Sequence, residues 1–363
     1  MFADRGFVAV GIDEIAAQVG VTGPAIYRHF KGKDALFAEV LEEAIRALAD
    51  ALDAASCSSN DTVKSVLEAT VSAILNSPTA ITAYLHERWM LKPPSPSMIE
   101  VERRVHLVWD RAVAEHLAGL DQLRAEVRLR SLASAFASGA RHPQGVARPR
   151  LDELFVASGL AVMHAEIHAA GAESDAVPRW RPAATRHEEI LDAALVLFRA
   201  RGVSDVGIDE IGVAAGISGP TVYYYFPSKA HIVLDAFERA GERITAGIGD
   251  VLRSATSPLD ALEKLIRSHV KVAMDTLDLI VLSSRERDAV PSGERERFRR
   301  RNRIIVDGWI SVVREVRPDL TEAETQLLVR TVFSLMHEAV ATAEGHGDLT
   351  EELVAIAMAY LIM

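Results

Sequence analysis

The chain has 363 residues, of which 49% are hydrophobic and 25% charged, and its formal net charge is −11 at pH 7. This length exceeds what one hydrophobic core usually supports, so two domains are expected. The composition excludes a disordered chain, and the acidic total argues against a protein coated in basic surface without excluding a local basic patch. One cysteine, Cys57, cannot form an intrachain disulfide, which fits a reducing compartment.

No apolar run reaches the roughly 20 residues of a membrane-spanning helix. The longest, LVAIAMAYLIM at residues 353–363, closes the chain. The N-terminus lacks the basic stretch and apolar core that direct export. We therefore expect a cytoplasmic protein with no membrane partner.

The chain contains an internal repeat. Residues 5–33 (RGFVAVGIDEIAAQVGVTGPAIYRHFKGK) and 201–229 (RGVSDVGIDEIGVAAGISGPTVYYYFPSK) align without a gap at an offset of 196, and 14 of the 29 positions are identical. Weaker similarity continues at nearly this spacing, for example where Phe136 faces Phe333. Two copies therefore span the chain, and the small, polar and proline residues at 171–184 are typical of a linker between them.

Apolar residues recur at helical spacing in both copies, for example at Leu262, Leu265 and Ile266. No strand alternation and no hairpin dipeptide between β-branched runs is evident. The sequence therefore predicts an all-α fold.

The second copy predicts two helices in succession. Ile190, Ala194 and Phe198 form one apolar stripe, and basic residues before Gly202 are typical of a helix end. A shorter helix with Ile211 on its apolar side follows and ends at Gly216.

A third helix follows after a three-residue turn. Ser218 suits its N-cap, Pro220 is tolerated in its first turn, and Val222 and Phe226 point inward. Two short helices joined by a tight glycine turn, behind a longer one, form the helix-turn-helix pattern.

The outward side of this third helix carries Thr221, Tyr224 and Tyr225, with Tyr223 at its boundary. Their hydroxyl and methyl groups are of the kind that reach phosphates and base edges in a major groove. The alternative is that the tyrosines pack beneath later helices, as aromatic residues at helical spacing usually do.

Lys229 and its counterpart Lys33 stand at the start of the next helix, where the helix dipole disfavours a cation. This placement is explained if an external phosphate binds there. A solvated surface lysine is the alternative.

GIDEIGVAAGISGPTVYYYFPSKAHIV (207–233) and GIDEIAAQVGVTGPAIYRHFKGKDALF (11–37) resemble the DNA-binding domain of the tetracycline-repressor (TetR) family. The resemblance implies two tandem units, each with a helix-turn-helix head followed by a helical ligand-binding and dimerisation domain. It implies a bacterial, DNA-binding transcriptional regulator of the ligand-responsive repressor type, and not an enzyme. No cofactor is expected.

The resemblance also implies which residues meet double-stranded operator DNA. In the first copy the matching positions are Thr22, Pro24, Ala25, Tyr27, Arg28, His29 and Lys33, and in the second they are Ser218, Pro220, Thr221, Tyr223, Tyr224, Tyr225 and Lys229.

Two departures from the family pattern stand out. Gly11 and Gly207 occupy a position where a threonine commonly caps the second helix and meets a phosphate. Met1 aligns with Leu197, so the first copy would lack most of its first helix. We expect the native start to lie upstream, and the alternative is a weakened first head. The apolar stripe that this would expose consists of Ile12, Ile15 and Val19.

The predicted domains follow from the repeat and the resemblance. They are a first head at 1–45, a first helical regulatory domain at 46–170, the linker at 171–184, a second head at 185–242 and a second regulatory domain at 243–363.

Members of the family bind near-palindromic operators as homodimers, whereas this one chain carries both heads. We therefore expect a monomeric covalent pseudo-dimer whose late helices, at 151–167 and 349–363, pack as an internal four-helix interface. Because Arg28 and Thr221 distinguish the heads, the operator should have unlike half-sites. The alternatives are a ligand-sensing or protein-binding pseudo-regulator that has lost DNA binding, and a homodimer of tandem chains.

The family's effector pocket lies among the middle helices, and the small-molecule effector is unknown. Candidate lining residues, which are equally typical of plain core, are Trp89, Met90, Trp109, Phe136, Trp309, Phe333 and Met336. His164 and His168 have metal-compatible spacing, but helix-face histidines without further ligands are usually structural, so no metal is expected.

Overall fold

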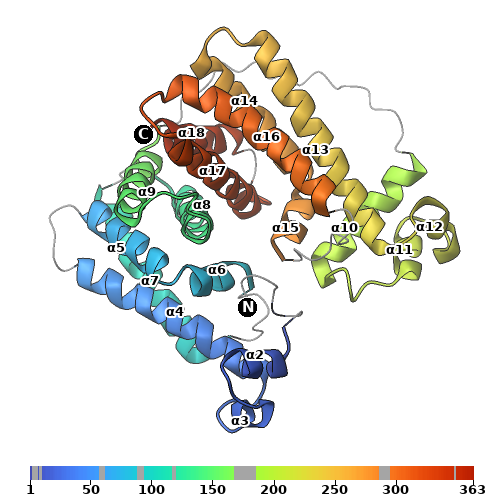
Figure 1. Ribbon diagram of the computed structural model, residues 1–363, viewed down its shortest axis with the longest axis horizontal. Helices are drawn as coiled ribbons and strands as arrows, with labels where there is room; N and C mark the ends of the chain where they lie inside the picture. The colour runs from blue at the N-terminus through green and yellow to red at the C-terminus, as the bar shows by residue number, and fades with distance from the viewer. Residues whose placement is uncertain are drawn as a thin grey trace. The chain divides into compact units, whose positions relative to one another are not determined.

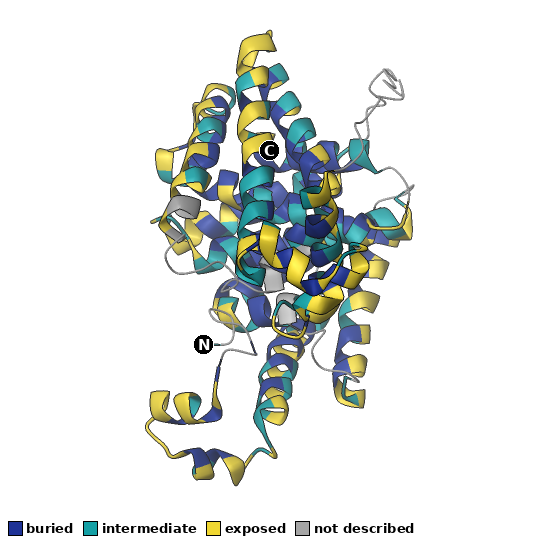
Figure 2. Ribbon diagram, turned by 90° about the vertical axis from the view of Figure 1, so that its right-hand side faces the viewer, coloured by how far each residue is buried: buried dark blue, intermediate teal, exposed yellow. Residues whose placement is uncertain are grey.

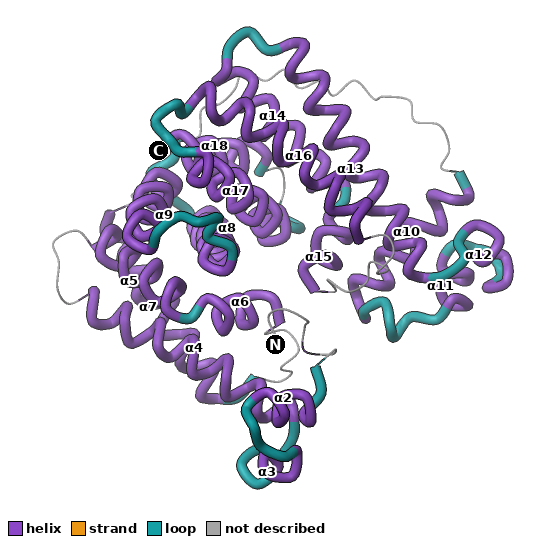
Figure 3. Tube along the Cα trace, in the orientation of Figure 1, coloured by secondary structure: helices purple, strands orange, loops and turns teal. Residues whose placement is uncertain are grey.

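A computed structural model describes residues 1, 7, 10–56, 62–87, 94–116, 120–166, 185–285, 295–346 and 349–363. These residues form helices joined by turns and loops, with no strand among them (Figure 3). The all-α prediction is confirmed. Within the described ranges, no helix combines the length and apolar character needed to cross a bilayer. The linker predicted at 171–184 lies outside the described residues.

The chain divides into two compact units (Figure 1). Unit 1 comprises Met1–Glu166, Arg317–Gly345 and Ala355–Met363, and unit 2 comprises Ile167–Val316 and His346–Val354. This division differs from the sequence halves, because the last helices of the second copy cluster with the first copy. The domain boundaries drawn from the sequence stay a prediction.

The helices of unit 1 are α2 (Ile12–Gln18), α3 (Gly23–Tyr27), α4 (Lys33–Ser56), α5 (Thr62–Asn76), α6 (Pro78–Glu87), α7 (Pro96–His116), α8 (Gln122–Arg141), α9 (Arg148–Met163) and α17 (Glu322–Ala343). Those of unit 2 are α10 (Arg186–Arg201), α11 (Ile208–Ala214), α12 (Gly219–Tyr225), α13 (Lys229–Ser254), α14 (Pro258–Asp275), α15 (Leu277–Arg285) and α16 (Arg295–Val316). Residues of α18 (Thr350–Ile362) belong to both units.

Each unit has a long helix that follows its head and organises the helices behind it. In unit 1, α4 packs against α5, α6 and α7, while in unit 2, α13 packs against α14 and α16. Most helices bury one side and expose the other, as the colours of Figure 2 show. This amphipathic burial is what the helical spacing of apolar residues in the sequence indicated.

Within unit 1, α17 of the second copy lies along α8 of the first (Figure 1). The two helices approach closely at Gly139, where an added Cβ would stand 2.5 Å from Phe155, 2.8 Å from Thr331 and 3.2 Å from Leu327. Tyr360, near the end of α18, donates a hydrogen bond to the Thr331 hydroxyl at 2.8 Å. Helices α8, α9, α17 and the end of α18 thus pack together, and we call this packing the seam.

The helix starts correct the register of the repeat at the seam. Helices α8 and α17 begin directly after the N-cap residues Asp121 and Thr321, an offset of 200. Phe136 therefore matches Met336 rather than Phe333, the partner that the sequence spacing suggested. The offset grows from 196 at α5 and α14 to 200 at α8 and α17 because α14 and α16 are longer than their counterparts α5 and α7.

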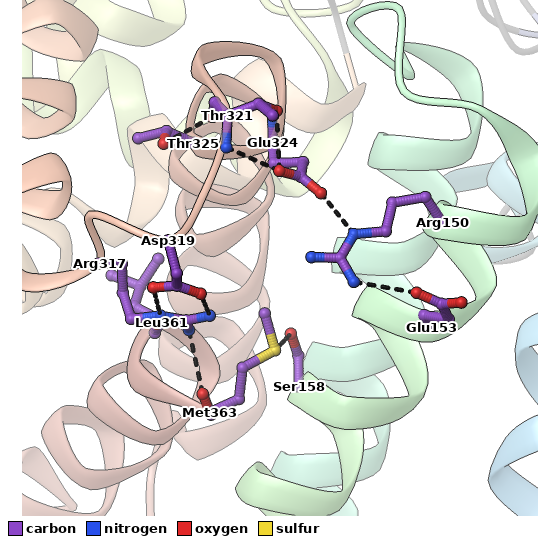
Figure 4. A network of polar contacts seen from close by, with 10 residues as sticks. All are labelled: Arg150, Glu153, Ser158, Arg317, Asp319, Thr321, Glu324, Thr325, Leu361 and Met363. Carbon is purple, nitrogen blue, oxygen red and sulfur yellow. Dashed lines mark hydrogen bonds and ion pairs between the residues drawn. The ribbon is translucent and has the colours of Figure 1, made fainter.

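Polar contacts join the same helices at one end of the seam (Figure 4). Arg150, in the first turn of α9, forms ion pairs with Glu324 of α17 and, at 2.9 Å, with Glu153. Arg317 donates to the backbone carbonyl of Met363 at 3.0 Å and so satisfies a carbonyl oxygen at the chain's end.

The ion pair between Arg150 and Glu324 predicts a pH-dependent stability. Burial raises the pKa of Glu324, but hydrogen bonds from Arg150 and Thr321 outweigh it, and the pKa lies below its ordinary value of 4.5. The stabilisation is therefore complete above about pH 4.5 and is lost as the pH falls through the lowered pKa.

Arg150→Met should accordingly reduce the free energy of unfolding at neutral pH by about 1 kcal/mol, since the guanidinium is 44% exposed and partly screened. The difference from the unchanged protein should shrink as the pH falls below about 4.5 and through the lowered pKa of Glu324. Urea unfolding of both proteins between neutral and acidic pH measures this difference in the free energy of unfolding. If the difference is the same at neutral and acidic pH, the ion pair between Arg150 and Glu324 is not its cause.

Candidate nucleic-acid interface

The core of the second head comes from α10, α11, α12 and α13. Ile190, Phe198, Ile211, Val222 and Phe226 are at most 2% exposed and belong to one cluster. The inward positions of Val222 and Phe226 are therefore confirmed. With its apolar side buried, α12 presents its other side to solvent.

Close backbone packing sets the angle between α11 and α12. Gly216 has φ of +68°, which favours glycine. A Cβ on Gly212 would lie 2.8 Å from the backbone nitrogen of Gly219, and one on Gly219 would lie 1.8 Å from Asp209 Oδ1. The tight glycine turn inferred from the sequence is thus present, with additional glycines at the helix contact itself.

The solvent-facing side of α12 carries two of its three tyrosines. Tyr224 is 85% exposed and Tyr223 is 56% exposed. Tyr225 is half-buried, and its ring meets His187 of α10 edge-on at 6.5 Å between ring centroids. Tyr224 and Tyr223 are therefore available to a partner, whereas Tyr225 is shared between the surface and the head core.

The start of α12 differs in one detail from the expected cap. Ser218 occupies the N-cap position, but its hydroxyl pairs with the Thr221 hydroxyl at 2.7 Å and makes no side-chain cap hydrogen bond. Ser218, Pro220 and Thr221 are all exposed. Two hydroxyl groups and a proline ring thus form the leading edge of the helix.

The lysine that follows each short helix has partners inside its own head. Lys229 Nζ donates to the carbonyls of Val203 at 2.6 Å, Ser204 at 3.0 Å and Val206 at 2.8 Å. Lys33 Nζ has the equivalent contact to Val10 at 3.1 Å. Each ammonium closes the loop before the helix-turn-helix, an architectural function that the sequence pattern did not reveal because the partners lie 23 to 26 residues away. Phosphate binding by either lysine stays a prediction.

A glutamate binds the backbone N–H of the N-cap glycine in each head, where a side-chain cap is absent. Glu210 Oε2 accepts a hydrogen bond from the Gly207 N–H at 2.7 Å, and Glu14 does the same for Gly11 at 3.0 Å. The Arg201 guanidinium, 2.8 Å from Glu210, and this backbone N–H lower the pKa of Glu210. A glutamate three residues after the cap position is a sequence signal for this bond.

The first head presents a similar outward side on α3. Tyr27 is 57% exposed. Of the other predicted DNA-binding residues in this head, Thr22, Pro24, Arg28 and His29 are exposed, and Ala25 and Lys33 are half-buried.

The expectation of an exposed apolar stripe in the first head is only partly right. Val19 is 66% exposed, but Ile12 is buried at 9% because it packs with Ala16 and Ile26. Ile15 is half-buried, whereas its counterpart Ile211 in the second head is fully buried by α10. The described core of the first head is smaller than that of the second.

The candidate effector residues are core residues where they are described. Trp109, Phe136, Trp309 and Met336 are buried, Phe333 is half-buried, and Trp89 and Met90 lie outside the described residues. A groove of about 570 Å³ lies elsewhere in unit 2 and is lined by residues of α13 and α16. Among the described side chains, no group of three has the ligand types and proximity to hold a metal ion.

Comparison with known proteins identifies both heads. Residues 1–40 and 190–236 match the profile described as "Bacterial regulatory proteins, tetR family". The match covers the helix-turn-helix of each copy.

Relatives of the chain are transcriptional regulators by name. The HTH-type transcriptional activator FasR of Mycolicibacterium smegmatis is 31% identical over 87 residues, 24% of this chain and 40% of FasR, so the matched region spans less than half of that relative. The HTH-type transcriptional regulator CymR of Pseudomonas putida is 27% identical over 145 residues, 38% of this chain and 71% of CymR. The structure of a TetR-family regulator from Bordetella parapertussis 12822 is 18% identical, with a TM-score of 0.45 over 49% of this chain and 93% of that chain.

Proposed function

We propose that the chain is a TetR-family regulator, as the match of its two heads to that family's profile suggests, and that it is a ligand-responsive repressor that binds one operator as a covalent pseudo-dimer. The observation that carries the proposal is the second head. There, a glycine-set turn presents a short helix whose apolar side is fully buried and whose Tyr224 is 85% exposed. A helix in this arrangement suits a major groove.

Differences between the two outward helix sides favour an operator with unlike half-sites. Arg28 in the first head suits the two acceptors of a guanine, whereas Thr221 in the second offers a methyl group to thymine. The exposed Tyr224 has a phenol where Arg28 has a guanidinium.

The seam supports action as a pseudo-dimer. It joins helices of the two copies within one chain, the task that an interface between two chains performs in a homodimer. Because the two copies are covalently linked, the effective concentration at which they meet does not depend on the protein concentration.

A mobility-shift assay on the intergenic DNA beside the gene, combined with the solution mass, tests the proposal. A one-to-one complex of a single chain with one duplex is expected. Absence of any shift would favour the pseudo-regulator without DNA binding, and two chains per duplex would favour a homodimer of tandem chains. A release of the DNA by a small molecule is the expected sign of an effector.

Exchanging one side chain in each head tests the unlike half-sites. Arg28→Ala should weaken binding about 10- to 100-fold, equivalent to roughly 1–3 kcal/mol, and should relax base preference in one half-site only. Tyr224→Ala serves as the matched change in the other head. Titration of duplexes mutated in either half-site measures both, and equal losses at the two halves for Arg28→Ala would refute the assignment.

A further inference from the structure

We infer that the seam selects unlike halves: the α8 and α9 helices of the first copy fit the α17 and α18 helices of the second and reject a copy of themselves. This inference rests on the proposed pseudo-dimer and names what determines its pairing. Two elements at the seam carry it, one of charge and one of size.

The charge element involves the third residue of each seam helix. Asp121 accepts a hydrogen bond from the N–H of Arg124, and Thr321 accepts one from the N–H of Glu324. Arg124 and Glu324 therefore hold equivalent positions in α8 and α17. Arg150 forms its ion pair with Glu324. In a two-fold pair of first copies, Arg150 would face Arg124, and an attraction would become a repulsion.

The size element lies in the buried middle of the seam. With the offset of 200, Gly139 of α8 matches Ala339 of α17, and both are in the fully packed region. In a two-fold pair of second copies, the Ala339 methyl would take the place of the Cβ that Gly139 lacks. That position is 2.8 Å from Thr331 Cγ2 and 3.2 Å from Leu327, too close for an unshifted side chain.

The first copy has smaller residues where the second has Leu327 and Thr331. Their counterparts are Val127 and Ser131, both fully buried. Large side chains of α17 thus lie opposite a glycine of α8. The smaller side chains of α8 hold the equivalent positions opposite an alanine of α17. In an interior packed this densely, a difference of one methyl group changes the stability.

A second ion pair at the seam disfavours only one of the two kinds of like pair. Both the charge element and the size element are therefore needed. Arg130 of α8 pairs with Glu338 of α17 at 3.0 Å. The counterparts are Arg330 and Ser138, so a pair of first copies would lose this contact while a pair of second copies would retain it. Steric exclusion of the Ala339 methyl, where the native seam has Gly139, rejects a pair of second copies, and charge repulsion rejects a pair of first copies. Specificity of this kind requires such repulsive elements against the wrong partner.

A full-length chain with a protease site inserted in the 171–184 linker tests the inference without DNA. The folded protein is cleaved there, mixed with isotope-labelled cleaved protein and examined by native mass spectrometry after prolonged exchange. Complexes of one first fragment with one second fragment are expected throughout. Pairs of like fragments at a statistical proportion would overturn the inference, and this outcome is independent of whether the chain binds an operator.

Variants of the charge element reverse the preference. Arg150→Glu would face Glu324 in the native pair and Arg124 in a pair of first fragments, so like pairs of first fragments should appear. Adding Glu324→Arg should raise the proportion of unlike pairs again without removing the like pairs, because the new carboxylate then faces an arginine in both kinds of pair. Glu153→Gln, which changes another partner of Arg150, is the matched control and should leave pairing unchanged. Unlike pairs alone in Arg150→Glu would overturn the charge element.

The size element has its own rescue experiment in the uncleaved chain. Gly139→Ala should lower the midpoint of urea unfolding, and adding Leu327→Val and Thr331→Ser should recover part of that loss, because the close approach to Phe155 at 2.5 Å remains. The double variant that carries Leu327→Val and Thr331→Ser alone measures the stability that is lost with the side-chain volume. If the triple variant is no more stable than the sum of the separate losses predicts, the seam is not complementary in size.

Discussion

Ile211→Ala should lower the free energy of unfolding of unit 2 by about 2–5 kcal/mol. Ile211 is fully buried among residues of α10, α12 and α13, so the truncated side chain leaves a cavity between the helices that hold α12 in place. Urea unfolding followed by circular dichroism measures the loss. Binding to the half-site read by the second head should weaken with it.

The first head provides the matched control. Ile15 is the counterpart of Ile211 but is only half-buried, so Ile15→Ala should cost less than half as much. Equal losses in the two variants would show that the two heads have equivalent cores and would contradict the structural difference between them.

Lys229→Met should destabilise the second head by roughly 2–4 kcal/mol, because three carbonyl oxygens lose a charged donor. The carbonyls of Val203, Ser204 and Val206 all accept from Lys229 Nζ. Lys271→Met, at an exposed lysine of α14, controls for the loss of one charge. Urea unfolding at low and high salt measures the difference.

The same variant separates an architectural from a DNA-binding function of Lys229. If the lysine served only to bind phosphate, stability would be unchanged and the slope of log affinity against log salt would fall by about 1. A loss of stability with an unchanged slope would assign the lysine to the loop alone.

The local features of the heads were predictable from sequence because they depend on neighbouring residues. The spacing of Val222 and Phe226 indicated the buried side of α12, and Gly216 indicated the turn, both of which the structure confirms. The capping box at Thr185 begins α10 where helical spacing resumed. Short-range periodicity and turn chemistry suffice for such features.

Features set by distant parts of the chain were not predictable in the same way. Periodicity shows that a side chain is buried but not against what, so neither the carbonyl partners of Lys229 nor the burial of Ile12 followed from it. The register at the seam likewise depended on helix lengths that differ between the copies, and Phe136 was matched to Phe333 instead of Met336. Tertiary packing decided these cases.

The interleaving of α17 with unit 1 has a consequence for the order in which the protein forms. Arg130 and Glu338 are 208 residues apart, and Ser158 meets Met363 across 205 residues. At a synthesis rate of about 5–20 residues per second, the apolar faces of α8 and α9 wait roughly 10–40 seconds for the helices that cover them. The first copy is thus translated first but completed last, and its nascent surface is the stage most open to aggregation and to chaperones.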